Sequence, residues 1–313
     1  MSKIRKEIDW SEGEWKIMLE RQRRYMWPED SVLKFARWLG LHHGFTAVDI
    51  GCGLGYLGYT YWPYFGRRGK YYGIDHSLKL LRQASQAARG WAKGGKAVFL
   101  TGDAYHLPFE DNFADWVMCQ TILMHLVEPE RALKEMIRIL KPGGLIMCDE
   151  PDNVASGLAR GYFSVPEMKL EDQLLFNKMI LLANKGRIRL GRGDNSIGSR
   201  LPHLLTNLGM TDIGVRMNDE VFYLEPPYDD PRQKHRFEGI KRNMFDPKIQ
   251  RFWLKKNREE FLTGGGKPEE FDRLQKLTRK YRTIYKKQIE NRSLAMCGGT
   301  LYYITKGRKP MAG

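Results

Sequence analysis

The chain has 313 residues and is 42% hydrophobic, which is enough for one large domain or two small ones with a sizeable core. No apolar run approaches the ~20 residues of a membrane-spanning helix, and the N-terminus lacks the apolar stretch of a secretory signal. The formal net charge of +15 indicates an anionic partner or surface, although solvated Lys and Arg on helix faces would give the same excess.

Residues 1–30 are predicted to be an N-terminal helical extension. Its aromatic cluster, Tyr25 and Trp27, comes just before Pro28, where a helix would end. From Glu29 to Leu39, apolar residues recur at helical spacing and predict the first helix of the core.

The most informative stretch is the strand Val48-Asp49-Ile50, which runs into the turn Gly51-Cys52-Gly53-Leu54-Gly55. About 20 residues later a second apolar run ends in Asp75, as in a nucleoside-binding βαβ unit. Glycines let the backbone turn sharply, and an acid at the tip of the second strand can accept both ribose hydroxyl hydrogens. The spacing G-x-G-x-G, with Asp49 before it, favours a cationic or zwitterionic ligand over a pyrophosphate.

Three further segments follow in the order of an alternating α/β fold. Ala97 to Leu100 is predicted to be a strand that leads into Asp103 and Ala104. A strand from Phe113 to Gln120 follows Leu107-Pro108-Phe109. The run from Arg138 to Gly144 ends a helix and leads into the strand Leu145 to Cys148.

Residues 46–150 with these motifs resemble the class I S-adenosylmethionine-dependent methyltransferases. The resemblance implies a Rossmann-like, doubly wound sheet of seven strands, six parallel and one antiparallel, with S-adenosyl-L-methionine as the cofactor. In such a sheet the ligand lies at the carboxyl ends of the strands, where every motif above falls.

The resemblance also implies roles for particular residues. Asp49 would help to hold the amino-acid end of the cofactor, Asp75 would bind the ribose, and Asp103 would accept a hydrogen bond from the adenine amino group. The backbone amide of Ala104 would reach a ring nitrogen, and Tyr25 would belong to a lid. The whole predicted cofactor set is Tyr25, Asp49, Gly51, Gly53, Gly55, Asp75, His76, Asp103, Ala104 and Gln120.

Methyl transfer needs a general base only if the accepting atom is protonated. Two candidates stand out: His125, after the fourth strand, and Glu150, which is expected to follow the fifth strand and face the substrate. Either residue has a structural alternative. No metal site is predicted, because the four cysteines form no C-x-x-C pair and the histidines show no ligand spacing. Reduced thiols suit a cytoplasmic protein.

The predicted core comprises residues 31–224 and 293–308, with a cap segment at 153–190 that contains a loop or hinge at 157–163. The sixth and seventh strands are expected at 211–224 and 295–305, as an antiparallel hairpin. Between them, residues 225–292 form a helical insertion, in which Pro226 to Arg292 carry about 19 basic and 10 acidic side chains.

The leading interpretation is a methyltransferase that acts on a small, lipophilic or aromatic molecule, related to menaquinone and sterol methyltransferases. One alternative is an RNA methyltransferase whose basic insertion contacts phosphates. The other is a non-catalytic cofactor-binding or assembly protein. The insertion is also a candidate surface for an anionic membrane, and an oligomer is left open.

Overall fold

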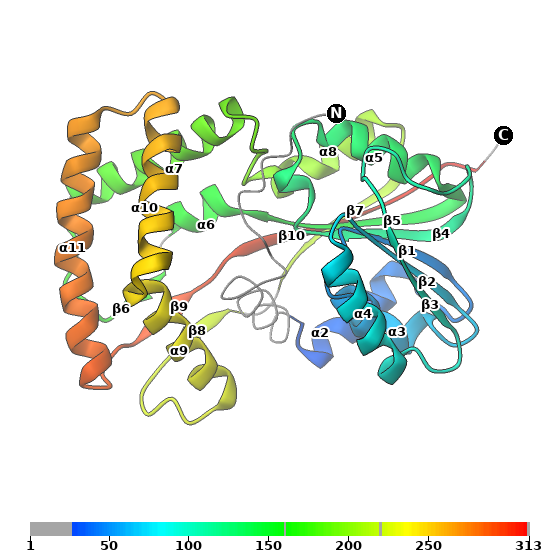
Figure 1. The fold of residues 1–313 in the computed structure, drawn as a ribbon, viewed down its shortest axis with the longest axis horizontal. Coiled ribbons are helices and arrows are strands. Elements are labelled where there is room, and N and C mark those ends of the chain that lie inside the picture. The colour runs from blue at the N-terminus through cyan, green and yellow to red at the C-terminus, as the bar shows by residue number, and fades with distance from the viewer. Residues whose placement is uncertain (1–26, 160, 219–220, 312–313) are drawn as a thin grey trace.

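The computed structural model describes residues 27–159, 161–218 and 221–311. A seven-stranded sheet runs through the larger half of the molecule in the order β3-β2-β1-β4-β5-β10-β7 (Figure 1). Its strands are β1 (Thr46–Ile50), β2 (Lys70–Asp75), β3 (Lys96–Thr101), β4 (Ala114–Gln120), β5 (Leu140–Asp152), β7 (Thr211–Met217) and β10 (Leu301–Arg308). β10 is antiparallel to both neighbours, and the pairs among β1 to β5 are parallel. The prediction of six parallel strands and one antiparallel strand is confirmed.

Helices cover both faces of this sheet. They are α2 (Glu29–Leu39), α3 (Tyr56–Phe65), α4 (Leu78–Trp91), α5 (Pro129–Arg138) and α8 (Leu201–Asn207), with short 3-10 turns η1 (Leu123–His125) and η2 (Ile197–Arg200). Successive side chains of β4 alternate between two buried cores. Trp116 and Met118 share one core with α2 and α3, whereas Val117 and Cys119 share the other with α5 and α8. A central parallel strand is buried on both sides in this way, which explains its nearly continuous apolar sequence.

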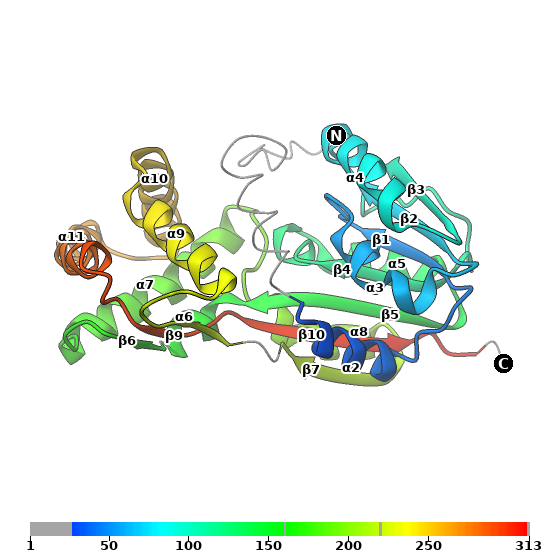
Figure 2. The same cartoon turned by 90° about the horizontal axis from the view of Figure 1, so that it is seen from below.

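A helical half extends from the carboxyl end of β5 (Figures 1 and 2). It contains α6 (Asn153–Ala159), α7 (Leu170–Arg189), α9 (Pro231–Phe245), α10 (Pro247–Thr263) and α11 (Pro268–Glu290), and a small sheet of β6 (Tyr162–Phe163), β9 (Met296–Gly298) and β8 (Phe222–Leu224). Leu175 of α7, Phe261 of α10 and Phe271 of α11 form one buried cluster. The segments 153–190 and 225–292, which are predicted as separate units, therefore share an apolar core.

The backbones of α7 and α10 approach closely at two glycines. A Cβ atom on Gly186 would lie 1.8 Å from the carbonyl oxygen of Glu260, and one on Gly264 would lie 1.9 Å from that of Leu182. Since no side chain tolerates such distances, glycine at these two positions sets how near the helices can come.

Two predicted strands are each divided between two sheets. The segment 211–224 forms β7 in the main sheet and β8 in the small one, and 295–305 forms β9 and then β10. Asn218 lies where the pairing changes: its Oδ1 accepts from the amide of Tyr302 at 2.8 Å, and its Nδ2 donates to the carbonyl of Thr300 at 3.1 Å. A side chain thus replaces ladder hydrogen bonds at the break.

Other boundaries also differ from prediction, and β5 begins at Leu140, five residues before the expected start at Leu145. β5 continues through Asp152, four residues beyond the expected end at Cys148, because β10 pairs with it as far as that residue. The prediction of a loop or hinge at 157–163 is wrong for residues 157–159, since α6 extends through Ala159. Among the described residues, no helix combines the length and apolar character needed to cross a membrane.

Candidate functional site

The glycine-rich turn joins β1 to α3 at the carboxyl end of the sheet. Gly51, Gly53 and Gly55 have φ angles of 70°, 52° and 77°, a region that favours glycine. The amides of Gly51 and Cys52 both donate to the carbonyl of Ile74, at 2.7 and 3.0 Å. The turn is therefore fixed to the end of β2, next to Asp75, the acid predicted to bind the ribose.

Asp75 ends β2, and its carboxylate is nearly buried. Oδ2 accepts the amide of Gly53 and Oδ1 accepts the amide of Ser77, both at 2.9 Å. A carboxylate has about four lone-pair sites, so it has acceptor capacity beyond these two bonds. His76 next to it is exposed, with Nδ1 3.4 Å from Oδ1 of Asp75. The arrangement fits a carboxylate held in place to accept hydroxyl hydrogens.

Asp49 lies in the interior, one residue before the end of β1. It is buried, and its Oδ2 accepts the hydroxyl of Tyr71 at 2.7 Å. Burial, together with Asp49, raises the pKa of Tyr71 well above its usual range, so the phenol keeps its proton and continues to donate. The hydroxyl of Tyr71 on β2 thus fixes the carboxylate of Asp49 just before the glycine turn.

Asp103 and Ala104 follow β3 at the same edge of the sheet. Asp103 is more than half exposed and its Oδ1 accepts the amide of Tyr105 at 3.0 Å, whereas Ala104 is buried. One carboxylate oxygen of Asp103, Oδ2, lies 3.8 Å from Nδ1 of His106. An exposed acceptor beside a fixed backbone is the arrangement that recognition of an amino group requires.

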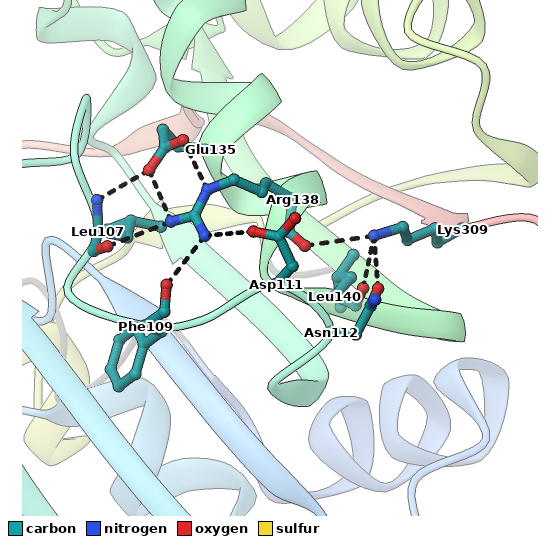
Figure 3. Close-up of polar contacts among 8 residues, drawn as sticks. All are labelled: Leu107, Phe109, Asp111, Asn112, Glu135, Arg138, Leu140 and Lys309. Carbon is teal, nitrogen blue, oxygen red and sulfur yellow. Dashed lines mark hydrogen bonds and ion pairs between the residues drawn. The ribbon is translucent and has the colours of Figure 1, made fainter.

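The loop that leaves Asp103 is anchored at its other end by Arg138 (Figure 3). The guanidinium donates to the carbonyls of Leu107 and Phe109 and to the carboxylates of Asp111 and Glu135. Glu135 also accepts the amide of Leu107 at 3.0 Å, and Arg138 holds the pKa of Glu135 below its ordinary value. These bonds connect the two sequence motifs, Leu107-Pro108-Phe109 and the run that begins at Arg138.

Gln120 ends β4 beside Asp149 of β5, to which it is paired in register. Both side chains are buried, and Nε2 of Gln120 donates to Oδ2 of Asp149. Thr121, which follows, has a φ of 52°, an uncommon conformation for a β-branched residue. The chain thus leaves β4 through a strained residue, and strain of this kind is often found at functional sites.

Glu150 does not lie beyond β5, as expected from the sequence, but within it, and its side chain is fully buried. Its Oε1 accepts the amides of Ile122 and Leu123, both at 2.8 Å, and its Oε2 accepts that of Met124 at 3.2 Å. Burial raises its pKa to about 8, against the effect of these amides. The expected placement was wrong, and these contacts make Glu150 a support for the loop that carries His125.

His125 is connected to the helical half by a buried ionic network. Its Nδ1 lies 3.2 Å from Nη2 of Arg187 on α7. A guanidinium only donates, so Nδ1 must be the acceptor and the ring proton lies on Nε2. Arg187 and Arg192 both lie near Oε1 of Glu260 on α10, at 3.7 and 3.6 Å. Nothing in the sequence pattern indicated Arg187, because its position depends on how α7 packs.

The predicted lid residue Tyr25 lies outside the described residues. Trp27 is described, and its ring makes edge contacts with Phe35 and Tyr61, at centroid distances of 5.7 and 5.8 Å. Trp27 therefore packs against the core. The other predicted cofactor residues gather at the carboxyl ends of β1, β2, β3 and β4, which neighbour one another in the sheet.

Comparison with known proteins gives consistent results. Residues 48–148 match the family model described as a methyltransferase domain. The demethylmenaquinone methyltransferase of Desulfitobacterium hafniense (strain Y51) is 32% identical over 143 residues, which is 45% of this chain and 53% of that protein. The protein of the same name from Staphylococcus aureus (strain MRSA252) is 36% identical over 112 residues, or 36% and 45% of the two chains. The chain thus spans about half the length of the curated relatives it matches.

The likeness to solved structures concerns the fold. The YcgJ protein of Bacillus subtilis superposes with a TM-score of 0.51 at 15% identity, over 91% of this chain and all of that one. The strand order, with its single antiparallel strand, and the glycine turn after β1 define a class I methyltransferase fold. Residues 48–148 form a methyltransferase domain, and this match together with the fold supports a class I, S-adenosylmethionine-dependent type of methyltransferase.

Proposed function

We propose that this protein binds S-adenosyl-L-methionine and transfers its methyl group to a small, lipophilic or aromatic acceptor. The observation that carries the proposal is the pairing of the glycine turn with Asp75, whose carboxylate is held by the amides of Gly53 and Ser77. The names of the relatives support a small-molecule acceptor, since they include demethylmenaquinone methyltransferases.

The bound cofactor would supply a methyl group on a positively charged sulfur. In the proposed arrangement Asp75 accepts hydrogen bonds from the ribose hydroxyls, and Asp103 accepts a hydrogen bond from the adenine amino group. The turn from Gly51 to Gly55 lies along the cofactor, and Gln120 with Asp149 forms the floor of the site next to Thr121. These residues orient the reactants, and orientation with exclusion of water is the main demand of an in-line displacement.

His125 would serve this reaction as a hydrogen-bond donor. With Nδ1 accepting from Arg187, the proton is on Nε2, and in this tautomer the ring can donate to an oxygen of the acceptor. We do not propose Glu150 as a base, because its buried carboxylate is bonded to the backbone amides of Ile122, Leu123 and Met124.

Two measurements test the proposal. Calorimetry should detect binding of S-adenosyl-L-methionine and of its demethylated product, and absence of binding for both would refute it. Incubation with methyl-labelled cofactor and fractionated cell extract should then transfer label to the lipid or small-molecule fraction. Transfer to RNA that weakens steeply with salt would instead support the RNA alternative, and cofactor binding without any transfer would support a non-catalytic role.

A further inference from the structure

One face of α7 exposes a row of large apolar side chains. Leu170, Leu174, Leu181 and Ile188 are each between 48% and 66% exposed. At about 100° per residue, their directions around the helix axis fall within about 40° of one another. The packing side of α7, represented by the buried Leu175, faces α10 and α11 instead. The helix therefore has two apolar faces, and within the described part of the chain only one of them is covered.

Positive charge lies along one edge of this exposed stripe. Lys178, Lys185 and Arg189 are exposed, and the same helical geometry places them within about 100° of Leu170. Lys178 is paired with Glu270 of α11. Of the six Lys or Arg residues in the segment 167–192, Arg187 and Arg192 lie in ion pairs with Glu260. The other four face three Asp or Glu residues in the same segment, so the exposed surroundings of the stripe carry a small net positive charge.

An exposed apolar residue of the core lies close to the end of α7. The amide of Gly191 donates to the carbonyl of Ile188 at 3.0 Å, which folds the chain back at the end of α7. A Cβ atom on Gly191 would lie 3.9 Å from Cγ2 of Val127, an exposed residue two positions after His125. The exposed Val127 thus lies next to the turn that ends α7.

We propose that this face of α7, together with Val127, docks the protein on an anionic lipid surface. A helix with a narrow apolar stripe beside Lys and Arg lies in the membrane interface, with its apolar side chains among the acyl chains and its charges at the headgroups. RNA would use the charges but would gain nothing from four aligned aliphatic side chains. The inference goes beyond the proposed methyl transfer and does not depend on it.

The test is sedimentation of the purified full-length protein with vesicles, without cofactor or acceptor. We expect binding to vesicles of equal parts phosphatidylglycerol and phosphatidylcholine, and much weaker binding to phosphatidylcholine alone. The double variant Leu174→Gln/Leu181→Gln should bind at least about tenfold more weakly, because two aliphatic side chains no longer enter the lipid. The control is Leu78→Gln, on α4, whose side chain is 59% exposed against 58% for Leu174 and which should bind like the wild type.

Each other outcome would overturn the inference. Equal binding by wild type and the double variant would show that the stripe does not enter the lipid. A wild-type dimer in light scattering that becomes monomeric in the double variant would assign the stripe to a second copy of the chain. Binding to RNA and not to anionic vesicles would assign the basic surface to nucleic acid. Thermal melting of all variants excludes misfolding as the cause.

Discussion

Replacing Asp75 by Asn tests the candidate cofactor site most directly. The carboxylate accepts two backbone amides, Gly53 on Oδ2 and Ser77 on Oδ1. An Asn side chain has one acceptor oxygen, so its NH₂ group would face one of these two N–H groups. The loss of the hydrogen bonds that the ribose hydroxyls would donate to a charged acceptor should cost about 1.5–3 kcal/mol. Calorimetry should therefore show cofactor binding weakened by about 10- to 150-fold.

Asp115→Asn is the matched control. Asp115 also accepts a backbone amide from another strand, that of Thr46 at 2.8 Å, and it pairs with Lys141 at 2.7 Å, but it lies at the amino ends of the strands. This variant should lower the free energy of unfolding by about 1 kcal/mol and leave cofactor affinity unchanged. Equal affinity of the wild type and Asp75→Asn, or equal weakening by both variants, would refute the assignment of Asp75 to the ribose.

Three further predictions concern stability. Arg138→Met should lower the free energy of unfolding in urea by about 2–4 kcal/mol. Arg131→Met is the control, because Arg131 lies on the same helix but makes an exposed ion pair, and it should lower that free energy by less than about 1 kcal/mol. Similar losses of stability in the two variants would count against the anchoring role of Arg138. Burial raises the pKa of Glu150 from 4.5 to about 8, so the protonated form stabilises the folded state at low pH, and this stability is lost as the pH rises towards about 8. Glu150→Gln should abolish this pH dependence of the free energy of unfolding. An unchanged pH dependence in the variant would contradict the prediction. Gly186→Ala should destabilise by about 1–3 kcal/mol through its clash with α10, whereas Gly90→Ala, which meets no atom within 4 Å, should be neutral or stabilising.

The sequence predicts the larger half of the fold well, for identifiable reasons. The helix expected at Glu29–Leu39 is found with those bounds, because its apolar residues recur at a clear helical period. The strands through Asp49 and Asp75 are short apolar runs that end in turn residues, so their ends and the acids at their tips were predictable.

The rest depends on contacts between segments distant in sequence. Asp149 and Glu150 read as the start of a loop, yet pairing with β10 keeps both in β5 and in the interior. The division of 211–224 between two sheets depends on how Asn218 bonds to the strand that returns some 80 residues later. The contact of Arg187 with His125 requires α7 to pack on α10, and no local sequence pattern predicts this packing.

The shared apolar core of the helical half restricts how the protein can be redesigned. Phe261 and Phe271 from the later insertion pack against Leu175 from the earlier one. β5, which leads into the earlier segment, and β10, which follows the later one, are hydrogen-bonded neighbours. Removing either segment to obtain a minimal catalytic domain would leave apolar side chains of the other exposed to water. Transplanting specificity into a related enzyme would therefore require moving both segments as a pair, with their connecting strands in register.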